Sequence, residues 1–165
     1  MLSIKNILLP SDGSECSLNA FKYILPFVKI LDTKLHLLTV ISEDHSFYNI
    51  YSDHKSPDQV RKRVNLVISK SLSFLISECE RANIKIKKEV RYGIPHEEII
   101  KYSKENDIDL IVIGTNSRRG FSKLLYGSVT ERVIQNSSCP VLVITPKFDF
   151  NKIKPLALEL VKSST

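Results

Sequence analysis

The sequence has few cysteines, few glycines and no long apolar run, and each shortage excludes a class of protein. Its three cysteines, Cys16, Cys79 and Cys139, are odd in number and far apart, which excludes a disulfide framework and a C-x-x-C metal motif. The longest uncharged run, residues 133–146, includes polar side chains, whereas a membrane-spanning helix needs about 20 apolar residues. Asp12 follows the first apolar stretch too closely for a signal peptide. We therefore expect a chain that stays in the reducing cytoplasm and contacts no membrane.

The five glycines are too sparse for the common nucleotide-binding motifs. No two of them are two positions apart, which excludes the G-x-G-x-x-G fingerprint. Gly114 and Gly120 are separated by five residues rather than four, and Gly120 precedes Phe121 rather than lysine, which excludes a P-loop. The four histidines form no close pair, and no serine lies in a nucleophile elbow. The sequence therefore assigns no metal ligand and no catalytic residue.

The proportions of apolar and charged residues, 42% and 25%, are typical of a soluble globular domain, and 165 residues are enough for one core. The formal net charge of +6 raises the question of nucleic-acid binding. The basic runs at 61–63 and 85–88 are short and lack interleaved aromatic residues. We interpret them as solvated faces and expect no nucleic-acid partner. One local excess is different, because Arg118, Arg119 and Lys123 lie between Gly114 and Gly127 with no acidic residue.

Apolar strands alternate strictly with amphipathic helices along the chain. Ser14 can cap a helix after the first strand, a second helix begins at Ser56, a third follows Pro95, and a fourth spans 128–136. This order predicts a doubly wound parallel sheet with helices on both faces, in one domain over residues 1–146. Residues 147–165 form a tail, for which a short helix after Pro155 and a frayed terminus are both open. The predicted strands are 4–9, 34–41, 84–91, 109–114 and 140–145.

Two loops after predicted strands are the candidates for a ligand site, because doubly wound sheets bind ligands where the winding reverses. The first strand ends in the segment PSDGS at 10–14, and the fourth ends at Gly114, with Gly127 and Ser128 opening the next helix. Free N–H groups after Gly127, the Ser128 hydroxyl and the helix dipole would form an anion site, with the basic residues of 118–123 as counter-charge. Alternatively, the two glycines are turn residues and the arginines are solvated. Asp12 is either part of a helix-entry turn or a contact to ribose or a metal ion.

Several longer motifs resemble the universal stress protein family. They are ILLPSDGSECSLNA at 7–20, the strand end at Val40, GIPHEEII at 93–100, DLIVIGT at 109–115 and GSVTERVIQNSSCPVLVI at 127–144, and the resemblance to the family extends over residues 4–145. The resemblance implies an α/β fold of the adenine nucleotide alpha hydrolase-like type, with five parallel strands in the order 3-2-1-4-5. It also implies a homodimer that pairs through the last predicted strand, Pro140 to Thr145, which would protect an exposed sheet edge.

The nucleotide-binding branch of this family is marked by G-x-x-G, nine residues and G-S/T, which is similar to Gly114-x-x-Ser117, nine residues and Gly127-Ser128. Ser117 replaces the second glycine and adds a Cβ where the backbone meets phosphate, although its hydroxyl could donate to a phosphate. The resemblance implies ATP or another adenine nucleotide, alone or with Mg²⁺ or Mn²⁺. Pro10, Asp12 and Val40 would line adenine and ribose, and Gly114, Gly127, Ser128 and Val129 would hold the phosphates. The full predicted set is Pro10, Ser11, Asp12, Val40, Ile113, Gly114, Thr115, Ser117, Arg118, Gly127, Ser128 and Val129.

The leading functional hypothesis is a nucleotide-binding module that acts in stress response or signalling through its nucleotide occupancy and its dimer contacts. One alternative is a weak ATPase or phosphotransferase, in which Asp12 holds a divalent ion and Ser128 lies near the transferred phosphate. The other is a nucleotide-free dimer that acts through protein contacts.

Overall fold

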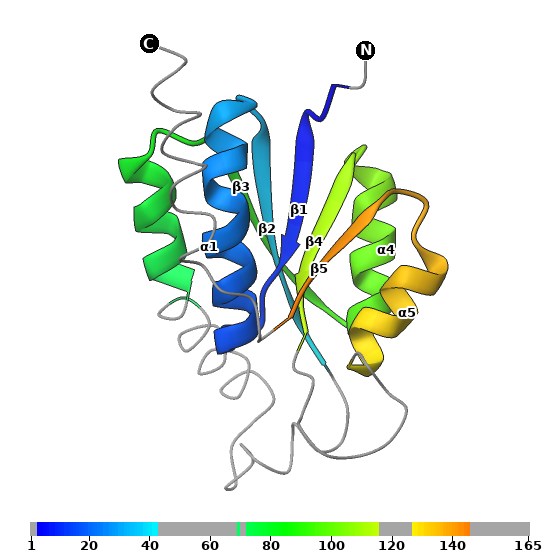
Figure 1. Ribbon diagram of the computed structural model, residues 1–165. Helices are drawn as coiled ribbons and strands as arrows, with labels where there is room; N and C mark the ends of the chain where they lie inside the picture. The colour runs from blue at the N-terminus through cyan, green and yellow to red at the C-terminus, as the bar shows by residue number, and fades with distance from the viewer. Residues whose placement is uncertain (1–2, 43–68, 70–71, 116–126, 146–165) are drawn as a thin grey trace, which may run out of the picture.

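The computed structural model describes residues 3–42, 69, 72–115 and 127–145. Within them, five parallel strands form one sheet in the order β3-β2-β1-β4-β5, which confirms the predicted doubly wound topology (Figure 1). β1 pairs with β2 on one side and with β4 on the other, so the winding reverses between β1 and β4. The strands are β1 (Asn6–Pro10), β2 (Lys34–Ile41), β3 (Ile86–Tyr92), β4 (Leu110–Gly114) and β5 (Val141–Ile144).

Helices cover both faces of this sheet (Figure 1). α1 (Glu15–Ile30) and the helical residues 72–81 lie on one face, and α4 (Pro95–Glu105) and α5 (Ser128–Asn136) lie on the other. The helix predicted from Ser56 is described only at residue 69 and over 72–81, where Leu72, Leu75 and Cys79 are buried. The earlier part of that helix and the predicted tail 147–165 lie outside the described residues.

Successive residues of the central strand point to opposite faces and build two apolar clusters. Ile7 and Leu9 share one cluster with the buried residues of α1 and of 72–81. Leu8 belongs to the other cluster, together with Ile99 and Tyr102 of α4. All three strand residues are fully buried. Because both faces are covered, the strand is a continuous apolar run rather than an alternating one.

α1 begins where the sequence predicts but buries a different stripe. The Ser14 side chain caps the helix by accepting a hydrogen bond from the Ser17 N–H at 3.3 Å. The periodicity places Leu31 on the buried face, yet Leu31 is 51% exposed. It is the C-cap residue, so it lies beyond the last helical turn that contacts the sheet. The residues that α1 buries are Ser17, Ala20, Phe21, Ile24 and Val28.

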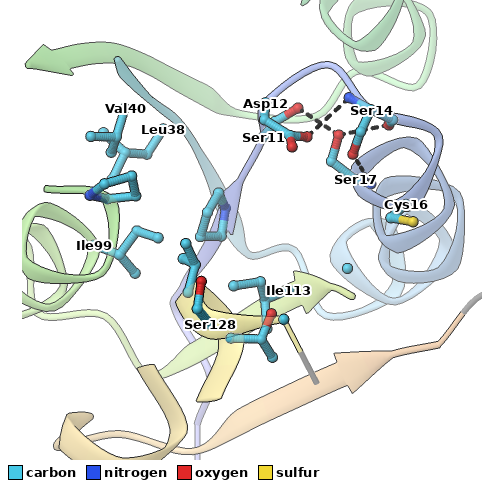
Figure 2. Close-up of a pocket in the computed structure, with 16 residues that line it drawn as sticks. Ser11, Asp12, Ser14, Cys16, Ser17, Leu38, Val40, Ile99, Ile113 and Ser128 are labelled. Atoms are coloured by element: carbon cyan, nitrogen blue, oxygen red, sulfur yellow. Dashed lines mark hydrogen bonds between the residues drawn. The ribbon is translucent and has the colours of Figure 1, made fainter. Parts of the chain in front are cut away.

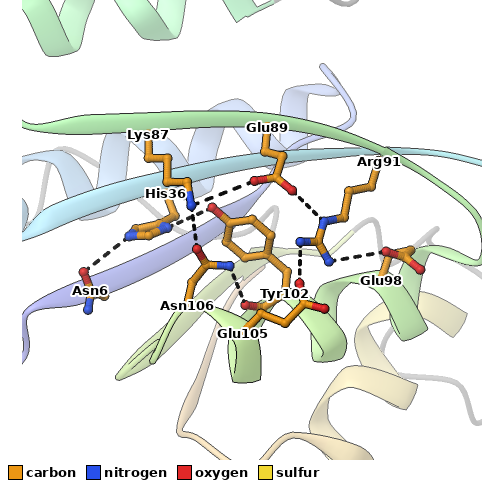
Figure 3. Close-up of polar contacts among 9 residues, drawn as sticks. All are labelled: Asn6, His36, Lys87, Glu89, Arg91, Glu98, Tyr102, Glu105 and Asn106. Carbon is orange, nitrogen blue, oxygen red and sulfur yellow. Dashed lines mark hydrogen bonds and ion pairs between the residues drawn. The ribbon is translucent and has the colours of Figure 1, made fainter.

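A polar network joins α4 to the strands beneath it (Figure 3). The Tyr102 hydroxyl lies 2.9 Å from Nδ1 of His36, and Nε2 of His36 lies 3.3 Å from Oδ1 of Asn6. Since a carbonyl oxygen can only accept, the hydrogen-bond pattern assigns the proton to Nε2 and makes Nδ1 the acceptor from Tyr102. Burial, with the charges of Lys34 and Lys87, lowers the pKa of His36 to about 4. The ring is therefore neutral at pH 7.

Arg91 of β3 forms the second part of this network (Figure 3). Its guanidinium contacts Glu105 at 2.6 Å, Glu89 at 2.8 Å and Glu98 at 3.5 Å. The Cζ atom also lies 4.7 Å from the ring centroid of Tyr102, a cation–π distance. Burial raises the pKa of Tyr102 to about 12. These contacts fix one side of α4 against β2 and β3.

Three further findings concern the cysteines, membrane-spanning helices and metal-binding groups. All three cysteines are free. Within the described ranges, no helix is both long enough and apolar enough to span a membrane. In the same ranges, no group of three or more His, Cys, Asp or Glu side chains could hold a metal ion.

Candidate functional site

A cavity of about 300 Å³ opens at the carboxyl ends of β1 and β4, where the winding of the sheet reverses (Figure 2). Its walls come from the ends of β1, β2 and β4, the loop after β1, and the first turns of α1, α4 and α5. Small-molecule sites enclose about 300–1,000 Å³, so a compact ligand is the expected occupant. The lining residues are Pro10, Ser11, Asp12, Ser14, Cys16, Ser17, Leu38, Val40, Pro95, Ile99, Ile113, Gly114, Gly127, Ser128, Val129 and Thr130.

Most of the predicted site residues meet at this cavity. Thr115 does not line it, and its side chain is fully buried. Ser117 and Arg118 lie outside the described residues. The nine predicted residues that line the cavity are Pro10, Ser11, Asp12, Val40, Ile113, Gly114, Gly127, Ser128 and Val129.

Hydroxyl and carboxylate groups form the polar wall, in the loop that joins β1 to α1 (Figure 2). The Oδ1 atom of Asp12 accepts from the Ser14 N–H at 2.9 Å, which fixes the start of α1. The Ser11 hydroxyl donates to Oγ of Ser17 at 3.1 Å and accepts from the Gly13 N–H at 3.3 Å. Gly13 has φ 76°, a left-handed conformation that glycine adopts without strain. Asp12 remains exposed, so its second oxygen is accessible to a ligand or to solvent.

An apolar wall faces these groups across the cavity (Figure 2). Leu38 and Val40 come from β2, Ile113 from β4, and Pro95 and Ile99 from α4. The sequence predicts Val40 and Ile113 in the site but not the other three. The i, i+4 spacing of Pro95 and Ile99 in GIPHEEII places both on one side of α4, but it does not show that this side faces the site. An apolar wall opposite a polar one suits a ligand with a flat apolar part and a charged part.

The two glycines of the predicted motif have different environments. A Cβ atom at Gly114 would lie 2.1 Å from the carbonyl oxygen of Cys16, so a side chain there collides with the backbone of α1. At Gly127, no heavy atom of the described residues lies within 4 Å of the same position. The conformation of Gly127, φ −64° and ψ 154°, is open to any residue. The fold therefore explains the glycine at 114, whereas at 127 the described fold leaves open space beside the cavity.

The first turn of α5 presents its backbone to the cavity. Gly127 is the N-cap residue, and no side chain among the described residues caps the helix. The N–H groups of Ser128, Val129 and Thr130 precede the first helical hydrogen bond, from the Glu131 N–H to the Gly127 carbonyl at 3.0 Å. Free N–H groups at the positive end of a helix dipole favour an anion.

Cys16 lines the cavity at the first turn of α1. Burial raises the pKa of its thiol, and the negative charges of Asp12 and Glu15 add to the rise. The thiol is therefore protonated at neutral pH and packs as a small apolar group.

Comparison with known proteins decides the family. The sequence profile of the universal stress protein family matches residues 3–145. The chain belongs to the universal stress protein family. It is similar to universal stress protein MJ0531 of Methanocaldococcus jannaschii, with 33% identity over 140 residues that cover 85% of this chain and 81% of the relative.

Solved structures of universal stress proteins share the fold. The structure of MJ0577, from the same archaeon, has a TM-score of 0.72 and 30% identity, and the match covers 90% of this chain and 100% of that one. A universal stress protein of Arabidopsis thaliana, solved with AMP bound, has a TM-score of 0.61 and 21% identity over 88% of this chain and 94% of that one. These likenesses confirm the adenine nucleotide alpha hydrolase-like fold that the sequence predicts.

The net charge of this universal stress protein lies outside its described fold. The described residues carry 12 basic and 12 acidic side chains, so the whole formal charge of +6 belongs to the other segments. Three of those charges, Arg118, Arg119 and Lys123, lie in the segment that joins Thr115 to Gly127. The described residues of the sheet and helices therefore carry no basic excess, and the segment with Arg118, Arg119 and Lys123 ends at Gly127, which lines the cavity.

Proposed function

We propose that this universal stress protein binds an adenine nucleotide, with ATP as the ligand, in the cavity between the ends of β1 and β4. The observation that carries the proposal is the open space at Gly127, at the uncapped start of α5 and on the cavity wall. A phosphate there would meet the free N–H groups of the first turn of α5. The AMP held by the Arabidopsis protein of the same fold supports an adenine nucleotide in this chain too.

The two walls divide the ligand between them in this proposal. The base lies against the apolar wall, with Val40 and Ile113 beside it and Pro10 at its edge. The ribose lies near Asp12, whose carboxylate can accept from a hydroxyl group. The phosphates point to Gly127, Ser128 and Val129, and the basic segment 116–126 supplies counter-charge from Arg118 and its neighbours.

A divalent ion would accompany the phosphates rather than occupy a protein cage. Mg²⁺ is commonly held by one or two carboxylates together with phosphate oxygens, and it keeps several of its waters. Asp12 is the one carboxylate among the described residues that line the cavity. It therefore fits Mg²⁺ or Mn²⁺ that arrives with ATP.

We further propose that the protein is a homodimer that pairs through β5. This edge strand, Val141–Ile144, has four apolar residues and no charge. The opposite edge strand, β3, carries Lys87, Lys88, Glu89 and Arg91, and charged edge strands resist pairing with another chain. Nucleotide occupancy and this interface together would carry a stress or signalling function in the cytoplasm.

Isothermal titration calorimetry of the full chain with ATP tests the ligand. We expect saturable binding to the wild type and its loss in Gly127→Val, whose side chain would enter the space assigned to phosphate. Ser138→Val is a matched control, because Ser138 is exposed at the opposite end of α5, and it should bind as the wild type does. If the wild type releases no heat with ATP and native mass spectrometry finds no adenine nucleotide, the proposal is wrong.

A further inference from the structure

We infer that Thr115 is a positioning residue, whose side-chain oxygen holds the start of α5 in place for the phosphates without touching the ligand. The motif that contains Thr115 predicts a ligand contact, but its side chain is fully buried and does not line the cavity. The inference rests on the proposed nucleotide function and deepens it.

Thr115 joins three elements at one point. It follows the last residue of β4, and its N–H donates to the carbonyl of Ile144, the last residue of β5, at 3.0 Å. Its Oγ1 atom accepts from the N–H of Gly127, the N-cap residue of α5, at 3.3 Å. One residue thus ties the ends of two strands to the beginning of the helix that faces the cavity.

The bond to Gly127 matters because α5 has no cap of its own. Gly127 carries no side chain, and in the described part of the chain no side chain accepts from the first turn of α5. The direction of the free N–H groups at 128–130 therefore depends on how Gly127 is held. Hydrogen bonds weaken steeply as their angle departs from linearity, and those to phosphate are stronger than neutral ones. A small rotation of the first turn would weaken several phosphate contacts together.

The base and the phosphates depend mostly on different elements, although Ile113, placed beside the base, comes from β4, which Thr115 follows. Val40, Leu38 and Ile99, on the apolar wall, come from β2 and α4, and neither element contacts Thr115 through a hydrogen bond in the described residues. A change at Thr115 should therefore reduce the affinity for phosphates and spare the affinity for the base. This separation distinguishes positioning from a general loss of folding, which would reduce both.

Two substitutions test the hydroxyl group and the methyl group of Thr115 separately. Thr115→Val keeps the shape and removes the oxygen, and Thr115→Ser keeps the oxygen and removes a methyl group. We expect Thr115→Val to weaken ATP binding about tenfold, which is the scale of one hydrogen bond to a charged group, and to leave adenosine binding unchanged. We expect Thr115→Ser to bind ATP as the wild type does.

Thr33→Val is the matched control. Thr33 is also buried, and its Oγ1 donates to the Val28 carbonyl at 3.4 Å, in the turn between α1 and β2 at the far end of the sheet from the cavity. This variant should keep the wild-type affinities for both ligands. Amide hydrogen exchange provides a readout without ligand, in which the Gly127 N–H should exchange faster in Thr115→Val, which removes its acceptor, and should be unchanged in Thr33→Val.

Calorimetry with ATP and adenosine on the four proteins gives distinct outcomes. A selective loss of ATP affinity in Thr115→Val, with faster exchange of the Gly127 N–H, supports positioning. Positioning is overturned, while the proposed function stands, if Thr115→Val loses ATP and adenosine affinity equally or keeps the wild-type ATP affinity. It is also overturned if Thr115→Ser loses as much ATP affinity as Thr115→Val does. A wild type that binds neither ligand would overturn both, and so the two failures are distinguishable.

Discussion

Replacing Gly114 with alanine should destabilise the fold, even though the motif predicts a ligand contact there. The added Cβ would lie 2.1 Å from the carbonyl oxygen of Cys16, 2.5 Å from its carbonyl carbon and 3.0 Å from the Ser17 nitrogen. All three are backbone atoms in the first turn of α1, so no side-chain rotation can relieve the contact. Either β4 or α1 must shift.

The size of the effect follows from the cost of overpacking a core. Inserted carbon atoms in a packed interior usually cost about 1–3 kcal/mol, and contacts with rigid backbone belong at the upper end. We expect Gly114→Ala to lower the free energy of unfolding by about 3 kcal/mol. For a chain of this size, 1 kcal/mol corresponds to roughly 2–4 °C, so the midpoint of thermal unfolding should fall by about 6–12 °C.

Urea and thermal unfolding of wild type, Gly114→Ala and Gly127→Ala measure this difference. The described residues leave the Cβ position at Gly127 free within 4 Å, so Gly127→Ala should cost no more than about 1 kcal/mol, mainly because alanine is a poor N-cap residue. Wild-type stability in Gly114→Ala would refute the steric argument. If the destabilisation is found, loss of nucleotide binding in a Gly114 variant cannot be attributed to a lost ligand contact.

Three further predictions concern the network at α4 and the start of α1. The pKa of His36 is lowered to about 4 in the fold, against about 6.5 in the unfolded chain, so the unfolded state binds the proton first as the pH falls. The free energy of unfolding, measured by urea titration, should therefore drop by about 2 kcal/mol between pH 7 and pH 5. An equal pH dependence of stability in His36→Gln would contradict this. Tyr102→Phe leaves the buried Nδ1 of His36 without its donor and should cost about 1–2 kcal/mol by the same assay, whereas no change would mean that the bond contributes nothing. Ser14→Ala removes the cap on the Ser17 N–H and should cost about 1 kcal/mol, measured by chemical unfolding, with Ser14→Asp restoring it.

The sequence predicts β2 and α5 with the bounds that the structure has, Lys34–Ile41 and Ser128–Asn136. Turn-forming residues bound each element on both sides. The apolar run of β2 fits a sheet that is covered on both faces. β3 begins two residues later than the sequence predicts. The reason is that the Ile84 N–H donates to the Cys79 carbonyl and closes the end of the preceding helix instead of joining the sheet. Apolar pattern alone does not show that competing hydrogen bond.

The residues of the candidate site, like the element bounds, are predictable from the sequence only in part. Residues in the loops after β1 and β4 are predictable, because strand ends at a reversal of winding are where doubly wound sheets bind ligands. Pro95 and Ile99 are not, because their place on the cavity wall depends on how α4 is fastened to β2 and β3 through Tyr102 and Arg91. Thr115 is adjacent to Gly114 in the motif but is fully buried, and its oxygen contacts Gly127. Sequence proximity predicts the neighbourhood of a residue but not the direction of its side chain.

Native mass spectrometry of the full chain, purified without added nucleotide and then titrated with ATP, tests the central claim most directly. The account predicts a mass increase that matches one adenine nucleotide per chain, either at purification or on addition of ATP, and its absence in Gly127→Val. A wild-type protein that keeps its unliganded mass at every ATP concentration would contradict the account. So would a Gly127→Val variant that binds ATP as tightly as the wild type does.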